Sequence, residues 1–145
     1  MQFRRMTLDD LDQVAAFSMA GLRAHLYPLW PSQEKVRHVV RHFIESETDF
    51  HLAAFDGERM VGGIAAAVTE MLWFERCEAT VVMFRAQTAG VGASLLDAMK
   101  TWAARDMRIR RVQIACEFDA PKAMARYLAM RGFKHQQVMA VAYKE

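Results

Sequence analysis

A glycine turn in the second half of the chain is the segment whose residues could do chemistry. Residues 81–96 read VVMFRAQTAGVGASLL, so Gly90 and Gly92 lie between a β-type run and a run with helical spacing of apolar residues. The first N–H groups of a helix lack partners, and glycine lets the main chain approach a phosphate closely. The segment therefore predicts a ligand that carries phosphates, with a tight turn that binds nothing as the alternative.

Two familiar phosphate loops do not fit this turn. The P-loop needs a lysine directly after its last glycine, whereas Ala93 and Ser94 follow Gly92 here. The dinucleotide-binding fingerprint needs a third glycine where Leu95 stands. The turn therefore belongs to another kind of phosphate site.

Composition excludes several classes of protein. The chain has 145 residues, of which 53% are hydrophobic and 25% charged, as expected for one globular domain over residues 1–145. A net charge of +2 gives no reason to expect a nucleic-acid partner. Cys77 and Cys116 show neither metal-ligand nor disulfide-framework spacing, so we expect no metal, and a single disulfide stays open. No apolar run matches a membrane span or a signal peptide, which predicts a cytoplasmic protein without a membrane partner.

The elements that must position the glycine turn follow the order β-α-α-β-β-β-α-β-α-β. Strands are predicted at 2–6, 50–55, 60–69, 78–84, 111–118 and 138–143, and helices at 8–21, 33–47, 91–106 and 121–132. Thr7 and Ser32 are the expected helix caps, Asp56-Gly57 is a hairpin turn, and Gly62-Gly63 indicates a bulge or a close backbone approach. This order predicts an α/β (α+β) fold with a mixed sheet and helices on both faces.

Several of these segments resemble one known family. Residues 87–92, QTAGVG, resemble the Q/R-x-x-G-x-G/A pyrophosphate loop of the GNAT superfamily of acyl-CoA N-acyltransferases. The runs FRRMTLDDL, LLDAMKTWAARD and ARYLAMRGF are similar to its first strand and cap, its third helix and its fourth helix. The resemblance covers nearly the whole chain, with a weaker likeness to small phage and prophage members. It implies a mixed, mostly antiparallel twisted sheet.

The resemblance also implies acetyl-CoA as the acyl donor. The pyrophosphate would lie on the main-chain N–H groups of the loop, and the pantetheine arm would pair with the fourth strand where it splays from the fifth. The Val82 N–H would lie near the thioester oxygen. The implied donor-binding residues are Val81, Val82, Gln87, Thr88, Ala89, Gly90, Val91, Gly92 and Ala93.

Two side chains are candidates for proton transfer. Glu78 is the candidate base, because it shares side-chain parity with Val82 on the expected strand, and an exposed carboxylate without a catalytic role is the alternative. Relatives often carry a tyrosine acid at the position of Leu128, whereas Tyr127 stands one residue earlier, about 100° around the helix. Either Tyr127 reaches the sulfur or water protonates the thiolate. Weaker candidates for the base are Glu70, Glu75 and His25.

The expected function is therefore transfer of an acetyl group from acetyl-CoA to a primary amine, by direct attack in a ternary complex. The acceptor is a small-molecule or peptide amine, and the segments 22–31 and 70–77 that would select it match no known pattern. A non-catalytic CoA-binding or protein-interaction module is the alternative. A homodimer also stays open, because the C-terminal segment 133–145 is short for the last strands of the family.

Overall fold

The computed structural model describes residues 1–23, 30–115 and 120–134. Its elements are β1 (Gln2–Arg4), the 3-10 turn η1 (Leu8–Asp10), α1 (Leu11–Arg23), α2 (Gln33–Glu45), β2 (Phe50–Asp56), β3 (Arg59–Glu70), β4 (Cys77–Ala86), α3 (Val91–Arg105), β5 (Ile109–Ile114) and α4 (Pro121–Met130). The predicted order is confirmed from the first strand to α4. The predicted last strand, 138–143, and residues 116–118 of the predicted fifth strand lie outside the described residues.

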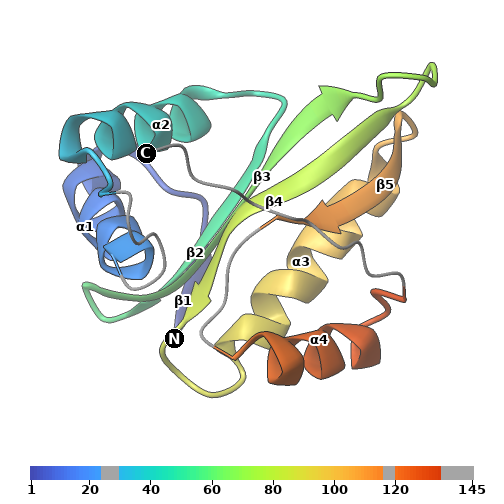
Figure 1. Ribbon diagram of the computed structural model, residues 1–145. Coiled ribbons are helices and arrows are strands. Elements are labelled where there is room, and N and C mark those ends of the chain that lie inside the picture. The colour runs from blue at the N-terminus through green and yellow to red at the C-terminus, as the bar shows by residue number, and fades with distance from the viewer. Residues whose placement is uncertain (24–29, 116–119, 135–145) are drawn as a thin grey trace.

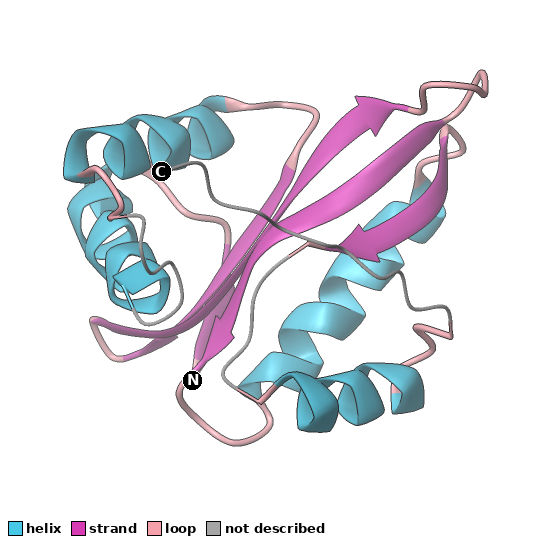
Figure 2. Cartoon of the chain, viewed as in Figure 1, coloured by secondary structure: helices cyan, strands magenta, loops and turns pink. Residues whose placement is uncertain are grey.

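One five-stranded sheet organises the chain, with the order β1-β2-β3-β4-β5. Every neighbouring pair is antiparallel except β4 and β5, which run parallel because α3 carries the chain between them. Helices α1 and α2 cover one face, and α3 and α4 lie on the other (Figures 1 and 2). The predicted mixed, mostly antiparallel sheet with helices on both faces is confirmed.

Each face of the sheet has its own hydrophobic core. On one face, α3 buries Leu95, Leu96 and Met99 against β2, β3 and β4. Full burial of such a side chain is worth about 1.5–3 kcal/mol, so these three residues hold α3 firmly on the sheet. On the other face, Val14 and Val40 belong to a core that α1 and α2 form with Met6 and with β2 and β3. No helix in the described ranges is long and apolar enough to cross a membrane.

A charged network joins the first strand to the start of α1. Arg4 Nη1 and Nη2 donate to the Asp10 carboxylate at 2.7 and 2.8 Å, and the Thr7 N–H donates to it at 2.7 Å. The Arg4 hydrogen bonds, together with those from Thr7, lower the pKa of the Asp10 carboxyl to about 2. The predicted cap at Thr7 is present, and a 3-10 turn precedes α1. At α2, the Ser32 hydroxyl accepts from the Lys35 N–H at 3.3 Å, as predicted.

Two β-bulges interrupt the sheet register. Ala54 pairs with Gly62 and Phe55 with Met60, so Val61 is the additional residue on β3. Ala66 pairs with Val81 and Ala65 with Met83, so Val82 is the additional residue on β4. The first bulge confirms the irregularity predicted at Gly62-Gly63. The second has no sequence signal, and it lies at the centre of the site described next.

Candidate active site

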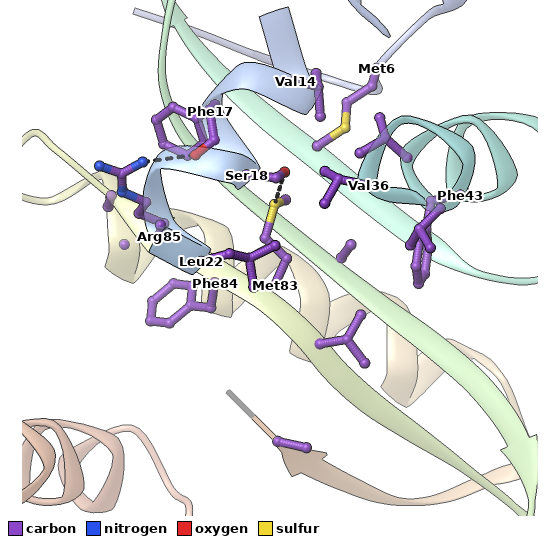
Figure 3. Close-up of a pocket in the computed structure, with 18 of the residues that line it drawn as sticks. Met6, Val14, Phe17, Ser18, Leu22, Val36, Phe43, Met83, Phe84 and Arg85 are labelled. Atoms are coloured by element: carbon purple, nitrogen blue, oxygen red, sulfur yellow. Dashed lines mark hydrogen bonds between the residues drawn. The ribbon is translucent and has the colours of Figure 1, made fainter. Parts of the chain in front are cut away.

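A cleft of about 960 Å³ opens between the α1/α2 layer and the end of β4. Figure 3 shows its walls: Phe17, Ser18 and Leu22 come from α1, Val36 and Phe43 from α2, and Met83, Phe84 and Arg85 from β4. The cleft continues to Gly92 at the start of α3 and to Tyr127 on α4. Because two helical layers and a strand end meet here, one ligand could contact the glycine turn and the α1/α2 layer together.

The glycine turn presents a row of main-chain donors. Among the six N–H groups of residues 88–93, only that of Val91 donates to an acceptor in the described part of the chain, the Thr88 carbonyl at 3.2 Å. No acidic residue lies in the first turn of α3, so nothing there competes with an anion for the helix dipole. Five N–H groups at a helix N-terminus form a site of the kind that binds a phosphate.

Contacts with β3 hold the turn in place. The Gln87 N–H donates at 2.8 Å to the carbonyl of Val61, the bulged residue of β3. A Cβ on Gly62 would lie 2.5 Å from Val91 Cγ1, so only glycine allows α3 to start so close to the sheet. Gly90 has φ +81°, a conformation in which other residues are strained. The predicted helix start at Val91 and the need for glycine at position 90 are thus confirmed.

The bulge on β4 opens the sheet at Val82. This residue has no register partner on β3, and its side chain is 44% exposed and lines the cleft. On the other side, pairing with β5 ends at Val81 and Ile114, while β4 continues to Ala86. The strands therefore part at Val82 in the described residues. A strand edge without a neighbour is where an extended ligand arm can pair with the main chain.

Tyr127 reaches the cleft although it precedes the position expected from relatives. Its hydroxyl lies 3.7 Å from where a Cβ on Gly92 would be, and the side chain lines the cleft. Leu128, at the position expected for a tyrosine, packs against the core under α3. The Arg131 guanidinium lies 5.5 Å from the centre of the Tyr127 ring. Tyr127 is thus on the donor side of the cleft, and its role as an acid stays a prediction.

Glu78 lies on the strand that carries Val82 but does not line the cleft. Its carboxylate accepts from Arg111 Nε at 2.7 Å and also from Arg111 Nη2. Gln113 Nε2 lies 3.3 Å from Oε1 and donates at 2.9 Å to the Thr80 hydroxyl. The carboxylate is therefore held by two residues of β5. Its role as a base stays a prediction that this arrangement does not favour.

The weaker candidates for the base lie elsewhere. Glu70 and Glu75 are at the β3–β4 hairpin, at the end of β4 far from the glycine turn. His25 lies outside the described residues. In the ranges that the structure describes, no group of three or more His, Cys, Asp and Glu side chains is arranged to hold a metal.

Sequence reasoning missed several residues that line the cleft. Phe17 and Arg85 were not singled out, and Val39 was expected inside the α2 stripe but is 40% exposed. Arg85 Nη1 donates to the Phe17 carbonyl at 2.8 Å, which links β4 to the end of α1. In the sequence, an apolar residue that faces a cleft looks the same as a core residue. The only local signal for this wall was therefore the apolar stripe of α2, whose edge is exposed in the structure.

Comparisons with known proteins agree with the fold. The chain superposes on a possible acetyltransferase from Clostridium difficile 630 with a TM-score of 0.76 and 15% identity, over 99% of this chain and 97% of that one. An aminoglycoside acetyltransferase from an uncultured soil metagenomic sample, in complex with sisomicin, gives a TM-score of 0.69 and 15% identity, over 99% and 95%. A transcriptional regulator from Bacillus halodurans C-125 gives 0.70 and 20%, over 99% of both chains. A search of curated proteins finds no match.

A family model decides the assignment. The model of the Acetyltransferase (GNAT) family matches residues 18–133, which include the glycine turn, the β4 bulge and α4. The matched region is most of the chain and contains the residues that line the cleft from Ser18 to Tyr127. This protein belongs to the GNAT acetyltransferase family.

Proposed function

We propose that this protein is an N-acetyltransferase that uses acetyl-CoA to acetylate a primary amine. The observation that carries the proposal is the position of two main-chain features on one cleft. The glycine turn, with its five N–H groups, meets one end of the cleft at Gly92, and the bulged Val82 lines the cleft on the strand that leads to the turn. A donor with a pyrophosphate and an extended arm matches both features, which supports CoA over a simple phosphate.

The donor would be held almost entirely by main chain. The N–H groups of Thr88, Ala89, Gly90, Gly92 and Ala93 would donate to the pyrophosphate, assisted by the positive end of the α3 dipole. Gln87 and Val91 would hold the turn, since both their N–H groups already have acceptors within the protein. The edge of β4 at Val82 would pair with the pantetheine arm, next to Val81, whose carbonyl accepts from the Ala115 N–H at 2.9 Å.

Acetyl-CoA, when bound, supplies a thioester carbonyl that the amine attacks directly in a ternary complex, forming a C–N bond while the C–S bond breaks and the thiolate leaves with the electron pair. The Val82 N–H would donate to the thioester oxygen as negative charge develops there. The Tyr127 hydroxyl would give its proton to the thiolate, and water would take the proton that the amine loses. Most of the remaining rate enhancement would come from positioning both reactants in the cleft.

Glu78 has a different proposed role. Its carboxylate accepts hydrogen bonds from Arg111 and Gln113, three residues before Val81, the last residue of β4 that pairs with β5 in the described residues. We therefore propose that Glu78 ties β4 to β5 within the paired segment that precedes Val82 and so helps to position the opening.

One observation favours a second candidate function. No described residue that lines the cleft is a carboxylate or a histidine, so a non-catalytic CoA-binding module is consistent with the same geometry. Both functions require the glycine turn to bind CoA. They differ in whether thiol is released.

Two measurements separate these functions. Calorimetric titration with CoA tests the donor site, and the absence of binding would contradict both candidates. Thiol release from acetyl-CoA, followed with a panel of amines, polyamines and peptides, tests catalysis. Release that depends on the amine supports the acetyltransferase. Tight CoA binding with no release from any acceptor would leave the binding module.

A further inference from the structure

The charges on the cleft wall restrict the chemistry of the acceptor. Among the described residues that line the cleft, none is Asp or Glu, while Lys35 on α2 and Arg85 on β4 are both cationic. Neither side chain forms an ion pair with a described residue. The α1/α2 side of the cleft therefore has positive charge that no carboxylate of the described residues neutralises.

The rest of this wall is apolar. Phe17, Val36, Val39 and Phe43 face the cleft from α1 and α2, and Met83 faces it from β4 (Figure 3). The polar group of Ser18 is occupied, because its hydroxyl donates to Met83 Sδ at 3.3 Å. An acceptor body in contact with this wall would gain by burying apolar surface and would find few hydrogen-bonding partners.

Lys35 lies where it can contact the acceptor and not the donor. It is in the first turn of α2, whereas CoA would lie along β4 and at Gly92, which line the same cleft. Among the described residues the Lys35 ammonium has no hydrogen-bond or ion-pair partner, and the main-chain N–H of Lys35 donates to Ser32 Oγ at 3.3 Å. Arg85 is less available, because one guanidinium nitrogen donates to the Phe17 carbonyl and the group stacks 4.7 Å from the Phe17 ring.

We infer that the acceptor is a primary amine on an apolar body that also carries a carboxylate, as in an α-amino acid with an aliphatic or aromatic side chain. The inference rests on the proposed acetyltransferase function. The apolar body would contact the α1/α2 wall, and the carboxylate would pair with Lys35. A polycationic amine such as sisomicin would bring like charges close to Lys35 and Arg85, where no described lining residue is a carboxylate, and this disfavours such an acceptor.

Matched probes test the inference. L-Phenylalanine, its amide and phenethylamine share one ring and one amine, but only the first carries a carboxylate, and sisomicin represents a polycation. In the thiol-release assay we expect L-phenylalanine to have the highest kcat/KM. Lys35→Met should raise its KM about fivefold, as for loss of one exposed ion pair, and leave the KM values of the amide and of acetyl-CoA unchanged. Lys35→Glu should reverse the preference between acid and amide.

The control is Arg41→Met, which removes a positive charge from the same helix outside the cleft lining, where Arg41 Nη1 lies 3.9 Å from Glu45 Oε1. It should leave the preference unchanged. Calorimetric titration of the same amines into the CoA-saturated protein tests acceptor recognition even without thiol release, so failure of catalysis and failure of the inference are distinguishable. Equal or weaker binding of L-phenylalanine than of its amide, or tightest binding of sisomicin, would overturn the inference.

Discussion

Arg111 on β5 holds the carboxylate of Glu78 on β4, its register partner across the single parallel pair of the sheet. Because both acceptor oxygens of Glu78 are engaged, we predict that Glu78→Gln lowers the free energy of unfolding by about 1 kcal/mol and reduces kcat less than about tenfold. The pH profile of kcat/KM should not move. Asp106→Asn, which breaks the exposed pair with Arg108 outside the cleft, is the control. A hundredfold loss together with a shifted profile would identify Glu78 as the base.

The glycine turn should be intolerant of side chains. Gly90→Val forces a β-branched residue into φ +81°, and a Cβ at Gly92 would already lie 3.3 Å from Phe84 Cζ. We predict that each valine weakens CoA binding at least about tenfold, because the main-chain donors move or are covered. Gly57→Val is the matched control, since it places the same residue at φ +59° in the β2–β3 hairpin. Calorimetry with CoA measures the difference, and unchanged affinity in the Gly90 variant would rule out this phosphate site.

The variant Tyr127→Phe tests whether the Tyr127 hydroxyl acts as an acid or only contacts the bound donor. If the hydroxyl protonates the leaving thiolate, its loss should lower kcat about 10- to 100-fold and leave the KM for acetyl-CoA nearly constant. The ring still packs against the α3 core, so the fold should be retained. Steady-state kinetics with both substrates varied gives the two constants. An increase in KM alone would show that the hydroxyl contacts the body of the donor, as its position beside Gly92 allows.

Buried His51 should make the fold sensitive to moderate acid. The ring is 1% exposed, its Nδ1 accepts from the Met6 N–H at 3.2 Å, and Arg5 Nη2 lies 3.1 Å from Nε2. Burial, reinforced by the Arg5 charge, lowers the pKa of His51 from 6.5 to about 4. Between these values the unfolded chain binds a proton that the folded protein does not, so stability falls as the pH falls. The loss should reach roughly 3 kcal/mol at most.

Urea unfolding at about pH 7 and about pH 4.5 measures this loss. His51→Gln should be less stable than the parent near neutral pH, yet lose less stability between the two conditions, because it cannot titrate. The Asp10 carboxyl, with a pKa lowered to about 2, contributes stability that is lost only below 3.8, so its window does not overlap. Parallel decreases in parent and variant would contradict the assignment to His51.

The helices, the hairpin and the glycine turn could be predicted from sequence because their signals are local. The type and spacing of Gly90 and Gly92 predict a turn, and Ser32 and Thr7 predict the starts of helices. The predicted fifth strand begins at residue 111, two residues after the observed start of β5 at Ile109, because nothing in the sequence separates Ile109 and Arg110 from the end of α3. This difference moves one strand boundary and leaves the predicted order of elements correct.

The geometry of the site depends on contacts between distant segments and could not be predicted in this way. The bulge at Val82 is set by how β4 pairs with β3, and a run of two valines, a methionine and a phenylalanine carries no mark of it. The Glu78–Arg111 pair joins residues 33 positions apart, through a parallel register that follows from the path of α3. Family resemblance indicated an opening near Val82, but the engagement of Glu78 required the structure.

Val82, the additional residue of the β4 bulge, is needed for the proposed CoA binding but not for the fold. Val81 faces the α3 core and Met83 faces the α1/α2 core. In a chain without Val82, the side chains from Ala79 to Arg85 would therefore alternate regularly between the two faces of the sheet. Such a deletion should retain the near-ultraviolet circular dichroism of the parent while the strand edge closes and CoA no longer binds. A descendant could thus keep this fold as an inert scaffold after losing one amino acid.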